Sequence, residues 1–230
     1  INGKVTTGMS HFLFRPFMTQ YTRLDRKTRH AADMYINVLE QLGVTDVSNH
    51  GLHIETCKEW NDEVSRFYES QGVMPHDKLI GFNIGSAVPE KRWPAERFAD
   101  VADYFADKGY KTVFFGGPMD LEMVKPVVEH MKTTPIVATG AFKIGSLAAA
   151  MKWCDLVITN DSGPMHVAIS QGVPIVALYG PSNPFFYGPY QAKSIVLESM
   201  DHYEIGKSMK KVIKEGKYKG ISVITEEQVI

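Results

Sequence analysis

The sequence predicts an α/β fold, a doubly wound parallel sheet of the Rossmann-like type, and three observations support this prediction. Six apolar runs of strand length follow one another after Lys78. Most of these runs are separated by stretches with helical periodicity, and most are followed by short loops of small and polar residues. Strands that are apolar on both faces and alternate with helices are typical of a parallel sheet covered on both sides.

The six apolar runs give the order of the strands along the chain. They are Leu79–Phe82, Thr112–Phe115, Ile136–Ala138, Leu156–Thr159, Ile175–Tyr179 and Ser194–Leu197. A helix is predicted between the first two, because Pro94 suits a first helical turn and Gly109 suits a helix end. In sheets of this type a ligand binds beyond the carboxyl ends of the strands, where the strand order reverses.

The 230 residues and their 44% hydrophobic content suffice for a full buried core. We divide the chain into a first segment 1–77, a regular domain 78–200 and a basic helical segment 201–230. No apolar run reaches the length of a membrane span. The two cysteines are far apart and give neither a disulfide framework nor a zinc signature, so the default location is a reducing compartment, the cytoplasm.

The net charge of −1 conceals two basic segments. The first, residues 1–30, carries six Lys and Arg against Asp25, and the second carries six Lys against Glu215. The lysines of the second segment are Lys207, Lys210, Lys211, Lys214, Lys217 and Lys219. A solvated surface explains such clusters, and the alternative is attraction to a phosphorylated or membrane-surface partner. Nucleic acid is disfavoured, because the overall charge is not basic.

The most informative stretch is residues 160–166, which connects a predicted strand to a predicted helix. Asp161, Ser162 and Gly163 form the turn, and His166 falls on the first turn of the helix. Free N–H groups and the positive end of the helix dipole favour an anion at such a turn. The alternative is that Asp161 or Ser162 is only an N-cap and Gly163 only a turn residue.

Other strand-end loops supply further candidates for the same edge of the sheet. Ser86 and Lys91 follow the first strand, Asp120 follows the second and Phe142 follows the third. A lysine offers a compact charge suited to phosphate, a carboxylate can bind ribose hydroxyls, and an aromatic ring can lie against a base. Each of these loops also has a purely structural interpretation as a turn or a helix start.

Four ordered motifs within residues 78–200 resemble glycosyltransferase family 9, the ADP-heptose:lipopolysaccharide heptosyltransferases. The motifs are Gly85-Ser86-x4-Lys91-Arg92-Trp93-Pro94, Gly116-Gly117-Pro118-x-Asp120, Asn160-Asp161-Ser162-Gly163-Pro164-x-His166 and Tyr179-Gly180-Pro181. The resemblance continues more weakly through Arg29-His30-x-x-Asp33-x-Tyr35. It implies a GT-B fold in which the first domain binds the acceptor and the second binds the donor. It also implies inverting, metal-independent transfer of a heptose from ADP-heptose to the lipopolysaccharide inner core, with no cofactor.

The resemblance assigns roles to the candidate residues by position. Those expected to bind the donor are Ser86 and Lys91 at its phosphates, Asp120 at the ribose, Phe142 near adenine, Asp161, Ser162 and Gly163 at the pyrophosphate and sugar, and His166 beside them. No Asp-x-Asp pair for a divalent ion is present in the sequence.

Two departures from the family pattern limit what this chain is expected to do. The family's proposed general base, an Asp near the start of its amino-terminal domain, has no counterpart here. Ala87 replaces a second hydroxyl residue, which leaves another nucleotide sugar open as donor. We therefore expect the donor-binding half of a transferase plus part of the preceding domain, located in the cytoplasm or at the inner face of the cytoplasmic membrane. The alternative is a non-catalytic module that binds nucleotide sugars.

Overall fold

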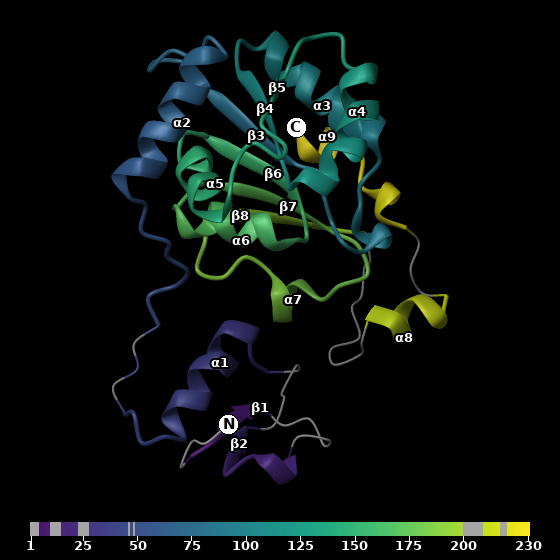
Figure 1. The fold of residues 1–230 in the computed structure, drawn as a ribbon. Helices are drawn as coiled ribbons and strands as arrows, with labels where there is room; N and C mark the ends of the chain where they lie inside the picture. Colours follow the sequence, from purple (N-terminus) through teal and green to yellow (C-terminus); the bar gives the residue numbers. More distant parts are fainter. Residues whose placement is uncertain are drawn as a thin grey trace.

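The computed structural model describes residues 5–9, 15–22, 28–45, 47, 49–199, 209–216 and 220–230. Its centre is a six-stranded sheet with the order β5-β4-β3-β6-β7-β8, in which every neighbouring pair is parallel (Figure 1). The strands are β3 (Leu79–Asn83), β4 (Lys111–Phe115), β5 (Ile136–Val137), β6 (Leu156–Asn160), β7 (Ile175–Tyr179) and β8 (Ser194–Glu198). The predicted fold and all six predicted strands are confirmed, with ends that differ by one residue at most.

The strand order reverses between β3 and β6, which lie side by side at the middle of the sheet. Chain order runs outward from β3 through β4 to β5, and then continues on the other side from β6 to β8. This is the dinucleotide-fold order, whose reversal opens a crevice at the carboxyl ends of the two central strands.

Helices cover both faces of the sheet (Figure 1). One layer consists of α2 (Lys58–Ser70), α5 (Ile144–Met151) and α6 (Gly163–Ser170), and the other of α3 (Ala95–Asp107), α4 (Leu121–His130) and α9 (Glu226–Val229). Successive side chains of β3 alternate between the two cores, with Leu79 in one and Ile80 and Phe82 in the other. The helix predicted behind Pro94 is α3, and it buries Phe98, as its apolar spacing predicts.

The segment before the sheet contains β1 (Thr7–Met9), the 3₁₀ turn η1 (Arg15–Phe17), β2 (Gln20–Thr22) and α1 (Ala31–Glu40). Met34 of α1 packs with Phe186 of the short helix α7 (Pro184–Tyr187), so this segment contacts the loop that follows β7. Helix α2 belongs by sequence to the segment 1–77, yet it packs on α5 of the sheet domain. The division at residue 77 stays a prediction.

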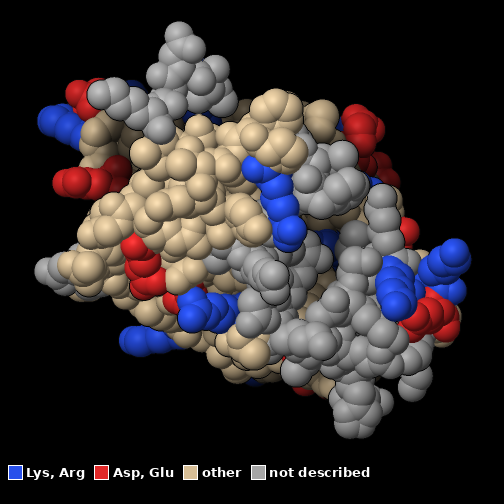
Figure 2. All heavy atoms as spheres, turned by 90° about the horizontal axis from the view of Figure 1, so that it is seen from below, with Lys and Arg blue, Asp and Glu red and all other residues tan. Residues whose placement is uncertain are grey.

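Part of the basic segments lies outside the described residues, namely Lys4, Arg23, Arg26, Lys27, Lys207, Lys217 and Lys219. Lys211 and Lys214 are on α8 (Met209–Lys214), and Lys211 pairs with Glu215 at 4.0 Å. In the view from below, the described Lys and Arg side chains occupy several separate places, with acidic residues beside some of them (Figure 2). Among the described helices, none is both long enough and apolar enough to span a bilayer.

Candidate functional site

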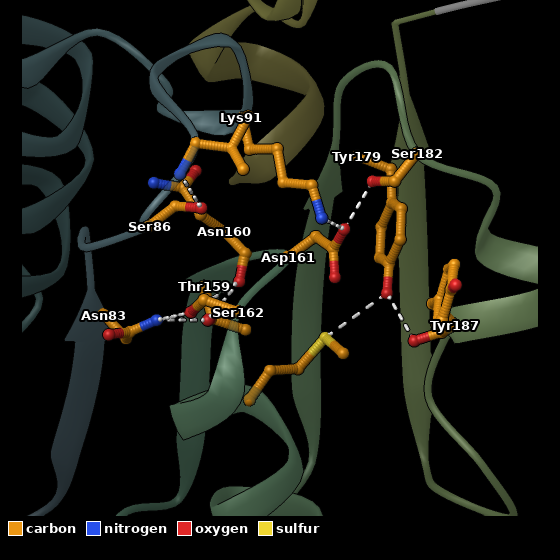
Figure 3. A network of polar contacts seen from close by, with 12 residues as sticks. Asn83, Ser86, Lys91, Thr159, Asn160, Asp161, Ser162, Tyr179, Ser182 and Tyr187 are labelled. Atoms are coloured by element: carbon orange, nitrogen blue, oxygen red, sulfur yellow. Dashed lines mark hydrogen bonds and ion pairs between the residues drawn. The ribbon is translucent and has the colours of Figure 1, made fainter. Parts of the chain in front are cut away.

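Two asparagines end the central strands at the crevice. Asn83 ends β3 and is fully buried, and its Nδ2 donates to Thr159 Oγ1 at 2.9 Å and to Ser162 Oγ at 2.7 Å (Figure 3). The Ser162 hydroxyl therefore accepts from Asn83 and donates weakly to the Asn160 carbonyl at 3.4 Å. This bridge ties the end of β3 to the turn that begins α6.

Asn160 ends β6 and holds the neighbouring loop between β3 and α3. Its Nδ2 donates to the Ile84 carbonyl at 2.7 Å, and its Oδ1 accepts from the Trp93 backbone N–H at 3.2 Å. Trp93 is itself buried, and its indole N–H donates to the Ile224 carbonyl at 2.9 Å. The loop that carries Ser86 and Lys91 is thus fixed near both of its ends.

Lys91, at the end of the 3₁₀ turn η2 (Pro89–Lys91), reaches across the crevice to Asp161. Lys91 Nζ lies 2.5 Å from Asp161 Oδ2, and the two side chains are only 17% and 6% exposed. Ser182, after β7, donates a hydrogen bond to the same carboxylate oxygen (Figure 3). One oxygen of the Asp161 carboxylate, Oδ2, is thus anchored by two side chains from different loops.

The amino terminus of α6 opens at this point. Ser162 is the N-cap and makes no side-chain capping bond, and Gly163 is exposed with open space where a Cβ would be. The first N–H groups of a helix carry a partial positive charge and favour an anion. The structure therefore brings Lys91, Asp161, Ser162 and Gly163 together, as the sequence predicts.

His166 lies at the end of the first turn of α6 and is partly buried. Burial lowers its pKa below the ordinary value of 6.5, the nearby Asp161 carboxylate opposes this shift, and His30 and Lys91 add to it. The imidazole is therefore neutral at pH 7, with one nitrogen that donates and one that accepts.

This shift predicts how stability depends on pH. Because the folded chain holds the His166 proton less tightly than the unfolded chain, the free energy of unfolding should fall as pH drops below 6.5 and level off below the folded pKa. Urea unfolding between about pH 5 and 8 should show a steeper dependence for the wild type than for His166→Gln. Equal slopes in the two proteins would contradict this environment for His166.

Ser182 offers a second test of the site's construction. Loss of a hydrogen bond to a charged group costs about 1.5–3 kcal/mol, so Ser182→Ala should lower the free energy of unfolding by roughly that amount. Ser194→Ala, at an exposed serine of β8, should change it by about 0.5 kcal/mol or less. Equal unfolding curves for the two variants would show that the Asp161 carboxylate does not depend on Ser182.

Ser86 lies in the loop between β3 and α3, and Asp120 lies beside this loop. Ser86 is buried, and its Oγ accepts weakly from the Val88 N–H at 3.4 Å. A Cβ on Gly85 would lie 2.6 Å from Asp120 Oδ1, which means that only glycine allows the carboxylate this close. Asp120 Oδ2 accepts from the Gly117 N–H at 2.8 Å. One carboxylate oxygen of Asp120 is thus engaged in the turn η3 (Pro118–Asp120), and its ribose role stays a prediction.

Phe142 is used in packing. Its ring meets Phe67 of α2 edge to face, with centroids 4.9 Å apart and planes at 72°. It is half-buried against the core between α2 and the sheet. A contact with adenine stays a prediction for this residue.

Sequence reasoning assigned no role in the site to Asn83, Asn160 or Ser182, although Asn160 is the first residue of the third family motif. Each of the two asparagines is a polar residue that ends an apolar run, and this is the one local signal that could have identified them. Ser182 has no such signal, because its partner is 21 residues away. Among the described residues, no group of three or more His, Cys, Asp and Glu could hold a metal ion.

Comparison with known proteins shows the family of this chain. The model of glycosyltransferase family 9 (heptosyltransferase) matches residues 4–219. The chain belongs to glycosyltransferase family 9. A family 9 crystal structure from Veillonella parvula DSM 2008 is 78% identical with a TM-score of 0.91, covering 99% of this chain and 65% of that one. The resemblance found in the sequence motifs is thereby confirmed.

More distant members of family 9 have named activities. Lipopolysaccharide heptosyltransferase 2 of Escherichia coli K12 is 33% identical over 157 residues, which is 66% of this chain and 44% of that protein. The structure of E. coli ADP-heptose LPS heptosyltransferase II has a TM-score of 0.77 at 24% identity and covers 98% of this chain and 67% of that one. The chain spans about half the length of the curated relatives it matches.

Proposed function

We propose that this chain binds the nucleoside diphosphate of ADP-heptose and takes part in transferring the heptose to a lipopolysaccharide-core acceptor. The observation that carries the proposal is the position of Lys91, paired with Asp161 at the amino terminus of α6 and at the reversal of strand order. The choice of ADP-heptose rests on the names of family members that are about one third or less identical to this chain.

The chemistry of the leaving group fits these residues. When the bond between sugar and diphosphate breaks, negative charge develops on the diphosphate, and donors already in place stabilise it without reorganisation. An ammonium group has three donors, and Asp161 uses one of those on Lys91. The remaining two, together with the α6 amino terminus, can meet the phosphate oxygens.

The carboxylate of Asp161 suits a different part of the donor. A carboxylate oxygen accepts hydrogen bonds from hydroxyl groups and repels phosphate. Lys91 and Ser182 hold the Asp161 carboxylate in place. Asp161 therefore suits a sugar hydroxyl next to the diphosphate. The proposal therefore assigns these residues to donor binding.

The proposal extends to the location of the protein. A lipopolysaccharide-core acceptor is anchored in a membrane, whereas a nucleotide sugar is water-soluble. We place the chain in the cytoplasm, at the inner face of the cytoplasmic membrane, where both substrates are accessible. Cosedimentation with vesicles of anionic lipid measures this contact.

Donor selectivity and transfer test the function. Calorimetric titrations should give tighter binding of ADP-heptose than of UDP-glucose or GDP-mannose. Equal affinities, or preference for another nucleotide sugar, would contradict the assignment of the donor. Transfer is then measured by mass spectrometry with ADP-heptose and a truncated lipopolysaccharide core that E. coli heptosyltransferase 2, the positive control, accepts. If the chain binds the donor but yields no product with this acceptor, it is a non-catalytic module that binds nucleotide sugars.

A further inference from the structure

The side chain of Asn83 lies beneath the donor site and is fully buried, so a ligand in the crevice does not reach it. Its amide nitrogen has two protons, and both are used, at 2.9 Å from Thr159 Oγ1 and 2.7 Å from Ser162 Oγ (Figure 3). Thr159 is the partner of Asn83 in the register of β3 and β6, so the first bond joins neighbouring strands. The second bond leaves the sheet and holds the residue that begins α6.

The Thr159 hydroxyl fixes which way round the Asn83 amide lies. Thr159 Oγ1 donates its own proton to the Asn160 carbonyl at 2.8 Å, so it accepts from Asn83. The amide nitrogen of Asn83 therefore faces both hydroxyl groups, and its oxygen, Oδ1, is buried without a partner among the described residues. Burial of an unpaired oxygen costs free energy, so stability alone does not select this arrangement.

The bond from Asn83 determines what the Ser162 hydroxyl does at the start of α6. A serine at the N-cap position ordinarily accepts a hydrogen bond from the N–H of the second or third helical residue. In α6 the second helical residue is Pro164, which has no N–H, so Met165 is the capping donor that Ser162 could use. Ser162 does not make this bond, because its side chain is turned to Asn83. The Met165 N–H instead donates to the Ser162 carbonyl at 3.2 Å.

This orientation of Ser162 keeps the amino terminus of α6 open. A hydroxyl oxygen bonded to the Met165 N–H would compete with a diphosphate oxygen that approaches the same helix end. We infer that Asn83 is a positioning residue of the donor site, an inference that rests on the proposed function. Asn83 holds the Ser162 hydroxyl away from the first N–H groups of α6 and so leaves these groups to the diphosphate.

Two Asn83 variants, a double variant and a matched control allow a direct test. Asn83→Ala removes the amide, and Asn83→Val does the same with a β-branched side chain that suits a strand. Asn83→Ala with Ser162→Ala also removes the hydroxyl that the single variant sets free. Thr159→Val, the control, removes the other acceptor of the same amide and leaves the bond to Ser162. Circular dichroism melting curves establish that the variants are folded, and Asn83→Val takes the place of Asn83→Ala if the latter is not.

Calorimetry with ADP measures the effect on the site. Both Asn83 variants should bind ADP about twofold to thirtyfold more weakly, because a capping bond of ordinary strength must first be broken. The double variant should bind ADP more tightly than Asn83→Ala, since the competing hydroxyl is gone. Thr159→Val should lose stability and bind ADP as the wild type does.

Three results of the titrations would overturn the inference. The first is an unchanged ADP affinity in the Asn83 variants, which would make Asn83 purely structural. The second is a double variant that binds ADP as weakly as Asn83→Ala or more weakly, which would mean that the Ser162 hydroxyl is no competitor. The third is an equal loss of affinity in Thr159→Val.

A measurement without ligand separates this inference from the proposed function. In heteronuclear NMR spectra the Met165 amide proton should move downfield in Asn83→Ala, because it gains the bond to the Ser162 hydroxyl, and should return in the double variant. If the wild type binds no ADP, the proposed function fails, and the Met165 shift still decides whether Asn83 holds the hydroxyl off α6. A Met165 resonance that stays in place in Asn83→Ala would overturn the inference, whatever the affinity for ADP.

Discussion

Replacing Lys91 by Ala is expected to weaken ADP binding by about 1.5–3 kcal/mol, roughly 10- to 150-fold. The variant removes the ammonium group of Lys91, whose Nζ lies 2.5 Å from Asp161 Oδ2 in the crevice at the α6 amino terminus. It leaves a carboxylate that is 6% exposed without its charge partner, and this carboxylate would repel a diphosphate. Equilibrium dialysis with labelled ADP measures the affinity, and chemical denaturation measures the stability in parallel.

Two variants serve as controls for the loss of Lys91. Lys143→Ala removes the same charge from an exposed residue of another strand-end loop and should change ADP affinity little. The double variant Lys91→Ala with Asp161→Asn removes both buried charges, so its stability should recover while its ADP affinity stays low. If Lys91→Ala destabilises the protein but binds ADP as the wild type does, Lys91 is structural and the donor site lies elsewhere.

Replacing Trp93 by Ala is expected to lower the free energy of unfolding by about 3–5 kcal/mol, the range for loss of a large aromatic side chain from a core. Trp93 is 3% exposed, packs edge to face on Phe98 at 5.0 Å, and donates its indole N–H to the Ile224 carbonyl. The variant therefore creates a cavity and removes one of the two hydrogen bonds that the Ile224 carbonyl accepts, the other coming from Arg97 Nη1. Urea denaturation measures the effect.

Trp153→Ala is the matched control for Trp93, because Trp153 is 37% exposed and lies against Tyr68 on the opposite layer of helices. Its loss of stability should be clearly smaller. Equal losses of stability in the two variants would show that Trp93 does not specifically anchor the loop before α3. A Trp93→Phe variant keeps part of the packing and should lie between Trp93→Ala and the wild type.

The sheet could be predicted from the sequence because its strands are buried on both faces. Strand β7 is the clearest case, since its five residues are all buried and form one uninterrupted apolar run with the predicted boundaries. The turn after β6 could also be predicted from neighbouring residues. Asp161, Ser162 and Gly163 are consecutive, and helix α6 begins at Gly163. The positions of these consecutive residues at the strand end could therefore be predicted, and their roles stay predictions.

Contacts between distant segments could not be predicted in this way. Phe142 follows a strand as a base-binding residue would, but α2 supplies Phe67 to pack against it. The stacking of His30 on Tyr190 joins residues 160 positions apart, and no periodicity in either segment announces the pair. The hydrogen bond from Ser182 to Asp161 likewise depends on β7 lying next to β6. Such pairings follow from the topology of the sheet and are visible only once it is formed.

Calorimetric titration of the wild-type chain with ADP in the presence of EDTA tests the central claim most directly. The claim is that Lys91, Asp161 and the α6 amino terminus form a site for a nucleoside diphosphate without the help of a divalent ion. The account predicts saturable binding of ADP at a single site, with an affinity that EDTA leaves unchanged. No binding of any nucleoside diphosphate at millimolar ligand, by protein shown to be folded, would contradict it.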